Sequence, residues 1–131
     1  MSGESNLDTL LSSMQPKVLE TEYVFCTLGQ GADLANCLNM EPIATFMEEE
    51  GLTLVLAKNM ADRHKLNYES VFRCITLTVH SSLDAVGLTA AVATKLAEHD
   101  ISANVIAAFY HDHIFVQAKK ADAAMQALKS F

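Results

Sequence analysis

The sequence predicts an α+β protein made of two related βαββα modules, each an antiparallel sheet with helices packed on one face. Its second half has the order strand, glycine-led helix, strand, hairpin, strand, helix. The two halves also end alike, because residues 54–62 align with residues 115–122 when one residue is gapped. We therefore expect an N-terminal helix in residues 1–15, a first module in residues 16–70 and a second module in residues 71–131.

Composition and charge limit the classes of function. A chain of 131 residues, half of them hydrophobic, can bury a core without disulfides or metals. A net charge of -7 and a pI near 5.0 argue against binding to nucleic acid or to an anionic membrane, because both require clustered Lys and Arg. No apolar stretch approaches the roughly 20 residues of a membrane helix. We therefore expect neither nucleic acid nor membrane among the partners.

Three cysteines favour a reducing compartment. Cys26, Cys37 and Cys74 are odd in number and show no CxxC spacing, which does not suit a disulfide framework. We interpret them as small, buried apolar side chains, with a redox or metal role as the alternative. Residues 1–14 are polar and acidic, without the pattern of an export signal. We therefore expect a cytoplasmic protein.

The first half opens with an amphipathic helix. Ser5 or Asn6 can cap it, and Pro16 prevents its continuation. Residues 17–28 are rich in β-forming residues but polar at residues 20–22, which predicts two strands joined by a tight turn. The apolar face of the helix consists of Leu7, Leu10, Leu11 and Met14.

The remainder of the first half predicts a short helix, a hairpin and another helix. Residues 32–38 have the length of one or two helical turns. Residues 43–47 and 52–56 predict two strands around a glycine-bearing turn, although a helix remains the alternative for residues 43–47. Asn59 can cap a helix that runs towards Leu66.

The second half begins with a strand and a helix. Residues 73–79 alternate between polar and apolar, as a half-buried strand does. A loop at residues 80–86 leads through Gly87 into a helix that ends near His99 and Asp100. Its apolar residues recur at helical spacing, which predicts one buried face made of Leu88, Ala91, Val92 and Leu96.

A hairpin and a final helix complete the pattern. Two apolar strands, residues 103–109 and 114–118, flank a predicted turn at residues 110–113. The last helix has a buried face made of Ala121, Ala124, Met125 and Leu128. This order of elements is the core of a ferredoxin-like sandwich.

Three stretches of the second half have a specific pattern. Residues 82–92 contain a loop after the first strand and a glycine that opens a helix. Residues 96–101 read Leu-Ala-x-x-x-Ile, and the hairpin strand in residues 110–116 contains Asp-His-x-x-Val. With these features the chain resembles the ACT domain family, and in particular the tandem ACT modules of aspartate kinases, the CASTOR arginine sensors and small uncharacterised bacterial ACT proteins. The resemblance spans most of the chain and implies two ACT-type modules.

One departure from the ACT pattern concerns the last strand. An ordinary ACT module has a fourth strand after its second helix, whereas this sequence ends at Phe131, directly after the predicted helix. An uncovered sheet edge invites uncontrolled pairing. We expect the strand near residues 17–20 to complete the second sheet, and the strand from Val71 to serve both modules.

The resemblance implies a ligand site at the loop after the first strand. In ACT modules a ligand, often an amino acid, lies between this loop and a neighbouring module. Gly87 would allow the backbone to approach closely, and the N–H groups from Val86 onward would attract a carboxylate. Asp84 or Asp112 could then face an ammonium or guanidinium group; alternatively, Gly87 only forms a turn and Asp84 caps the helix. The candidate ligand-binding residues are His80, Ser81, Ser82, Asp84, Val86, Gly87, Leu88 and Asp112.

The histidines offer a different kind of site. His111 and His113 flank Asp112 in the hairpin, and His80 lies on a loop that could be near. Such a set could bind zinc, but a His-x-His pair without a third fixed ligand is weak evidence. We therefore expect neither a metal nor a cofactor.

The expected function is regulatory and non-catalytic. The sequence contains no glycine-rich phosphate loop, no Gly-x-Ser-x-Gly and no HExxH, so no catalytic residues are expected. The expected partner is a small molecule, with an amino acid as the first choice, and the expected assembly is a homodimer. The alternative is a ligand-free interaction or oligomerisation module, and a metal-dependent enzyme is the remaining class.

Overall fold

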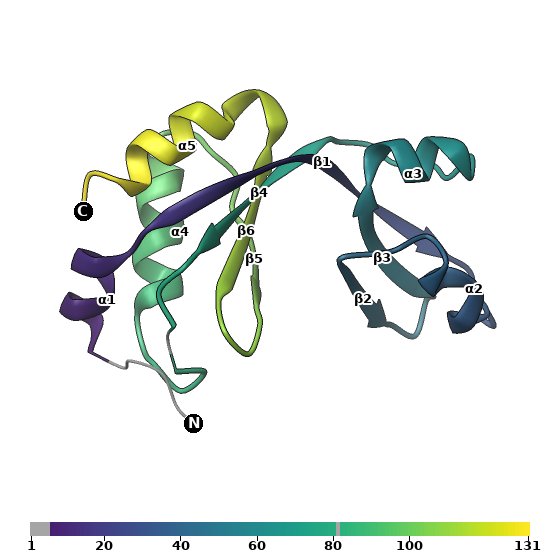
Figure 1. Cartoon of the computed structure of the whole chain (residues 1–131), viewed down its shortest axis with the longest axis horizontal. Helices are drawn as coiled ribbons and strands as arrows, with labels where there is room; N and C mark the ends of the chain where they lie inside the picture. The colour runs from purple at the N-terminus through teal and green to yellow at the C-terminus, as the bar shows by residue number, and fades with distance from the viewer. Residues whose placement is uncertain (1–5, 81) are drawn as a thin grey trace. The chain divides into compact units, whose positions relative to one another are not determined.

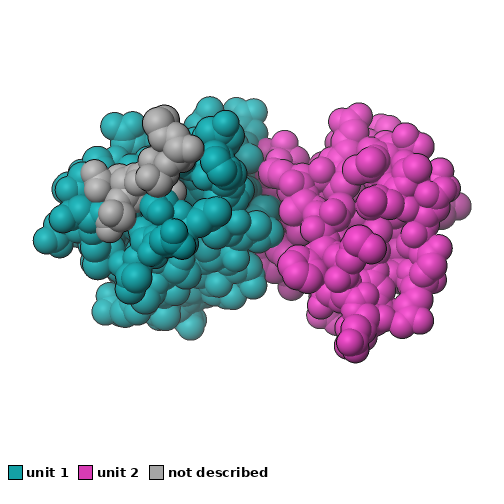
Figure 2. Space-filling view, turned by 90° about the horizontal axis from the view of Figure 1, so that it is seen from below, with its two compact units in different colours: residues 1–20, 73–131 teal, residues 21–72 magenta. Residues whose placement is uncertain are grey.

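The computed structural model describes residues 6–80 and 82–131. The chain is mixed α+β and divides into two compact units, one made of residues 1–20 with 73–131 and the other of residues 21–72 (Figure 2). We call them unit 1 and unit 2. No helix in the described residues is long and apolar enough to cross a membrane.

Strand β1 (Pro16–Leu28) contributes to both units, because it crosses the boundary between Glu20 and Thr21. The sequence predicted two strands with a turn at residues 20–22, and this prediction is wrong. Residues 20–22 are exposed, and they lie where the strand leaves the core of one unit before it enters the core of the other. These residues are polar because they are not packed in a core. In the sequence, an exposed stretch of strand looks the same as a turn, since both are runs of polar residues.

Unit 1 contains a sheet with the strand order β1-β4-β6-β5. Its helices α4 and α5 lie side by side on one face of that sheet (Figure 1). Besides the first part of β1, its elements are α1 (Leu7–Ser13), β4 (Phe72–Leu77), α4 (Leu88–Glu98), β5 (Asn104–Ala107), β6 (Asp112–Gln117), the 3-10 turn η1 (Ala118–Lys120) and α5 (Ala121–Leu128).

The N-terminal segment runs along β4. The carbonyl oxygen of Gln15 accepts from the N–H and the hydroxyl of Thr78, at 3.3 and 2.8 Å, and Arg73 Nε donates to the carbonyl oxygen of Leu19 at 2.8 Å. These bonds join residues that are 54 to 63 positions apart in the sequence. The first twenty residues therefore belong structurally with the second half of the chain.

The core of unit 1 lies between its sheet and its helices. Leu10 of α1 is fully buried there, so the N-terminal helix is part of the core. Burying a leucine side chain contributes about 1.5–3 kcal/mol to stability. Asn6, one of the two predicted caps, caps α1 because its Oδ1 accepts from Thr9 N–H at 3.0 Å. Other large, fully buried core residues include Ile75 and Leu77 of β4, Val92 and Leu96 of α4, Ile114 and Val116 of β6, and Leu128 of α5.

Unit 2 contains a sheet with the strand order β2-β3-β1. Strand β3 is antiparallel to both neighbours, with Leu52 opposite Leu28 on one side and opposite Met47 on the other. The strand prediction for residues 43–47 is therefore confirmed over the helix alternative. The elements of unit 2, besides the second part of β1, are α2 (Leu34–Leu38), β2 (Ala44–Met47), β3 (Leu52–Ala57) and α3 (Lys58–Arg63).

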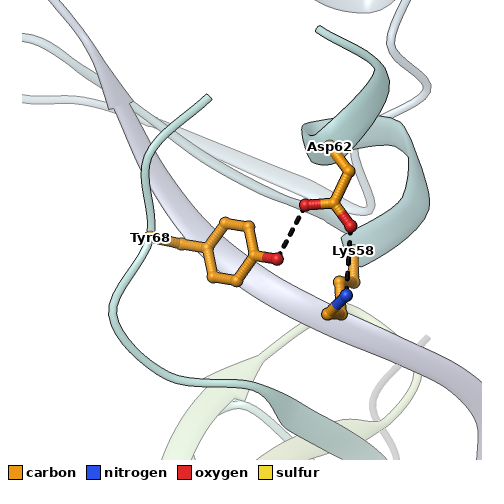
Figure 3. Close-up of polar contacts among 3 residues, drawn as sticks. All are labelled: Lys58, Asp62 and Tyr68. Atoms are coloured by element: carbon orange, nitrogen blue, oxygen red, sulfur yellow. Dashed lines mark hydrogen bonds and ion pairs between the residues drawn. The ribbon is translucent and has the colours of Figure 1, made fainter. Parts of the chain in front are cut away.

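Helix α3 begins two residues earlier than expected. Its N-cap is Ala57, without a side-chain hydrogen bond, and Asn59 lies inside the helix, so the predicted cap is wrong. The segment after α3 is held by Asp62, whose Oδ1 accepts from the hydroxyl of Tyr68 at 2.7 Å and whose Oδ2 pairs with Lys58 Nζ at 3.0 Å (Figure 3). The hydroxyl of Tyr68 and then Lys58 lower the pKa of the Asp62 carboxyl, because both favour its ionised form.

The three cysteines are free and buried, as expected for small apolar side chains. Cys26 and Cys37 belong to the core of unit 2 and Cys74 lies in β4. Burial raises the pKa of the Cys74 thiol to about 11. This thiol is therefore protonated at neutral pH, and a protonated thiol is a poor nucleophile.

Candidate functional site

The loop after β4 folds back on itself before α4 begins. Ser82 Oγ accepts from Asp84 N–H at 3.1 Å, and the Ser82 carbonyl oxygen accepts from Ala85 N–H at 3.0 Å. These two bonds leave Asp84 exposed and Val86 at the surface, with 84% of its area accessible. Ser81, another predicted ligand-binding residue, lies outside the described residues.

Gly87 opens α4 in a conformation that suits glycine. Its φ of 102° lies in the region that L-residues with a side chain avoid. A Cβ atom at this position would lie 3.0 Å from Leu7 Cδ2 of α1. Gly87 is the N-cap itself, so the alternative in which Asp84 caps this helix is wrong.

The first turn of α4 has no side-chain cap among the described residues, unlike α1, which Asn6 caps. The first hydrogen bond of the helix runs from Ala91 N–H to the Gly87 carbonyl oxygen, at 2.9 Å. The N–H groups of a first helical turn have no partner within the helix, and the positive end of the helix dipole lies there. The start of α4 therefore attracts an anionic group such as a carboxylate.

Leu88 and Asp112 lie close together, although they are 24 positions apart. They line one small cavity with Thr89, and this cavity is too small for a water molecule. Leu88 is buried in the core, whereas Asp112 is half-buried at the beginning of β6. A ligand that contacts both the start of α4 and Asp112 would therefore lie on the surface above this contact.

Asp112 does not lie in the hairpin turn, where the sequence placed it. It is the first residue of β6 and pairs with Ala107, and the turn consists of residues 108–111. The Ala108 N–H donates to the His111 carbonyl oxygen at 3.1 Å and closes this turn. The error arose because all four residues of Tyr110-His111-Asp112-His113 have polar side chains. Residue type therefore does not show at which of them the pairing of β5 with β6 begins.

His80 packs against the tip of the same hairpin. Its ring centroid lies 6.3 Å from that of Phe109 and 5.6 Å from that of Tyr110, and these two rings meet edge to face at 5.0 Å. Phe109 and Tyr110 remain more than half exposed. The three rings connect the loop after β4 to the β5–β6 hairpin, so the elements that carry the predicted site residues are in contact.

The histidines of the hairpin engage different partners. His113 Nδ1 shares a hydrogen bond of 2.9 Å with Thr76 Oγ1, and His111 Nδ1 lies 3.4 Å from the Val79 carbonyl oxygen. Burial, and then the nearby charge of His111, lowers the pKa of His113, while Asp112 opposes this shift. In the described residues, no group of three or more His, Cys, Asp or Glu side chains is placed to hold a metal ion.

A hollow in unit 2 was not found from the sequence. It has a volume of about 170 Å³ and lies between the turn at residues 29–32 and the β2–β3 turn at residues 48–51. Gly29, Gly31 and Gly51 all line it, although Gly51 belongs to a different turn from the other two. Only the pairing of β1 with β3 brings these turns together, so no local pattern could have revealed the hollow.

Family models match both halves of the chain. One model of the ACT domain matches residues 2–73, and a second, different model of the ACT domain matches residues 69–130. A search among curated proteins found no match.

Solved structures with the same fold include one that is also similar in sequence. A protein of unknown function from Vibrio cholerae, named as a possible transport protein, is 58% identical, with 94% of this chain and 93% of that chain covered and a TM-score of 0.86. A protein from Agrobacterium tumefaciens is 15% identical, covering 88% and 87% of the two chains, with a TM-score of 0.71.

The regulatory subunit of aspartate kinase from Thermus thermophilus, in its ligand-free form, has a TM-score of 0.61 at 10% identity, with 87% of this chain and 94% of that chain covered. At such identities the last two likenesses concern the fold alone.

Proposed function

Because this chain belongs to the ACT domain family, we propose that it is a non-catalytic regulatory protein that binds an amino acid. The observation that carries the proposal is the start of α4, where Gly87 has a positive φ and no described side chain caps the first turn. Binding there would shift the geometry or the association of the protein, because a ligand stabilises the state that it binds better.

In the proposed complex, both the carboxylate and the cationic group of the amino acid contact the protein. The ligand's carboxylate accepts from the N–H groups at the start of α4, which directly follow Gly87. Asp112 faces its ammonium group, or a guanidinium group if the ligand is arginine-like. His80, Ser82, Asp84 and Val86 form the loop around the ligand, and Leu88 forms the apolar base.

Amide chemical shifts test this site directly. Protein labelled with 15N is titrated with each of the common amino acids, and the signals of Gly87, Leu88 and Thr89 are followed. We expect one amino acid to move these signals to saturation, and its carboxamide derivative to fail because the negative charge is lost. If no amino acid moves these three signals, the site is not at the start of α4.

A protein–protein interaction module is the second candidate, and a specific surface favours it. Strand β2 is the outermost strand of the sheet of unit 2, and its residues Phe46 and Met47 are 69% and 79% exposed. Edge strands without charges are prone to pair with another chain, and β2 contains no charged residue. We propose that two copies of the chain pair through β2 to form a homodimer. Sedimentation measurements that compare Phe46→Ser with wild type test this proposal. A dimer that persists unchanged would show that this edge is not the interface.

We place the protein in the cytoplasm. Three free, buried cysteines support a reducing compartment, where thiols remain reduced. Cell fractionation with an antibody against the chain would test this assignment.

A further inference from the structure

The hollow in unit 2 has fixed walls. Gln30 Nε2 of the first turn donates to the Glu49 carbonyl oxygen of the second, which ties the two turns together. Each turn is closed by its own backbone bonds: Ala32 N–H to the Gly29 carbonyl oxygen at 3.2 Å, and two bonds between Glu48 and Gly51 at 3.0 and 3.3 Å. The backbone that borders the hollow is therefore preformed, which lowers the entropic cost of binding.

The walls combine apolar surface with one carboxylate. Leu34, Met47 and Leu52 supply the apolar part, and Glu48 supplies the charge. Glu48 Oε1 accepts from the Thr53 hydroxyl, which orients the carboxylate. No lysine or arginine is among the described residues that line the hollow. Glu48 therefore has no basic neighbour within the hollow to neutralise it.

Charge and size define the ligand class. Glu49 and Glu50 follow Glu48 directly, so the potential at this rim is negative and attracts cations. The hollow has a volume of about 170 Å³ and is open to solvent, with Leu34 and Met47 44% and 79% exposed, so a small molecule would lie against its walls with one side in water. A small cation with a short aliphatic chain matches both properties.

We propose that this hollow binds a small aliphatic ammonium ion, with the ammonium group at Glu48 and the chain against Leu34, Met47 and Leu52. This site lies wholly within unit 2 and is separate from the site at the start of α4. The ligand requires no carboxylate, so binding here does not depend on the proposed amino-acid site.

Butylammonium is the probe, and the glycine signals of the 15N spectrum are the readout. The chain has five glycines, and Gly29, Gly31 and Gly51 line the hollow, whereas Gly87 lies in unit 1 and serves as the internal reference. Butylammonium should move the three signals to saturation and leave Gly87 in place. Butan-1-ol, which has the same chain without the charge, should bind about tenfold more weakly or worse.

Two variants separate the charge from the apolar wall. Glu48→Gln keeps an oxygen that can accept from Thr53 but removes the charge, so it should abolish the preference for butylammonium over butan-1-ol. Glu50→Gln is the matched control, because Glu50 is a neighbouring exposed acid that does not line the hollow. Met47→Ala should weaken binding of both probes by the same factor, because it removes only apolar contact.

Three outcomes would overturn the proposal: no saturable shift of Gly29, Gly31 and Gly51, equal affinity for the two probes, or Glu48→Gln and Glu50→Gln behaving alike. These outcomes concern unit 2 alone. An amino acid that moves Gly87 while butylammonium moves none of the other glycines would sustain the proposed function and reject this second site. The reverse pattern would reject the proposed function and sustain the second site.

Discussion

Gly51 stands where backbone atoms leave no room for a side chain. A Cβ atom at this position would lie 2.4 Å from the Leu28 carbonyl oxygen, which is backbone in the paired strand β1 and cannot rotate away. We expect Gly51→Ala to lower the free energy of unfolding by about 1–3 kcal/mol, the usual cost of overpacking. Urea denaturation measures this loss. Gly29→Ala is the matched control, because nothing lies within 4 Å of its Cβ position, and an equal loss in both variants would contradict the steric argument.

His113 gives stability a dependence on pH. Its pKa is lowered from the ordinary 6.5 in the folded protein, mainly by burial. Below pH 6.5 the unfolded chain therefore takes up this proton while the folded chain does not, so the free energy of unfolding falls as the pH falls towards the folded pKa. We expect His113→Gln to lose less stability than wild type between pH 7.5 and pH 5.5. His64→Gln, which removes an exposed histidine of unit 2, is the control, and equal pH dependence in all three proteins would contradict this account.

At the scale of the residue, the sequence predicted the starts of α1 and α4, whereas the cap predicted for α3 at Asn59 was wrong. Gly87 and Asn6 were identified from their positions, because a helix start imposes strong local demands that are visible within a few residues. Asp112 was correctly associated with the hairpin but placed in its turn. The position of a carboxylate relative to a distant helix start depends on strand register, which no single stretch encodes.

At the scale of the element, α1 is a structural part of unit 1. Leu10 is fully buried between α1 and the rest of the core. We expect Leu10→Ala to cost about 2–5 kcal/mol of stability, as large-to-small changes in a core do. Thermal unfolding checks this, with Leu38→Ala as the control, because Leu38 is a leucine of α2 that is 58% exposed. A negligible effect of Leu10→Ala would mean that α1 is detachable.

Strand β1 shows what sequence patterns cannot distinguish. Three polar residues within a β-rich run predict a turn, because polarity is typical of turns. In the structure residues 20–22 stay extended and are exposed on the way from one unit to the other. By contrast, β3, β4 and β6 followed from their apolar patterns, because each contains a run of at least three consecutive buried residues.

At the scale of the whole molecule, the internal repeat was the most informative feature. Two ACT domain models match the two halves, so the inference of two related modules is confirmed. A repeat shows similarity and not which strand completes which sheet. The expectation that residues 17–20 pair with the second module came instead from the missing fourth strand, and β1 is indeed the neighbour of β4.

The proposed site makes a prediction about charge selectivity. Asp112 supplies the carboxylate that faces the cationic end of the ligand, so Asp112→Asn should weaken binding of a cationic amino acid by about tenfold. Isothermal titration calorimetry measures the change, and Asp122→Asn, an exposed acid of α5, is the control. If Asp112→Asn binds as wild type does, Asp112 is not part of the site.

Thermal unfolding of the wild-type protein against all twenty amino acids tests the central claim most directly, since a ligand at a hundred times its Kd adds about 2.7 kcal/mol to stability. The account predicts a selective rise in Tm with one amino acid or a chemically related group, reduced in Asp112→Asn. A Tm that no amino acid raises would contradict the claim that this chain is an amino-acid-binding regulator.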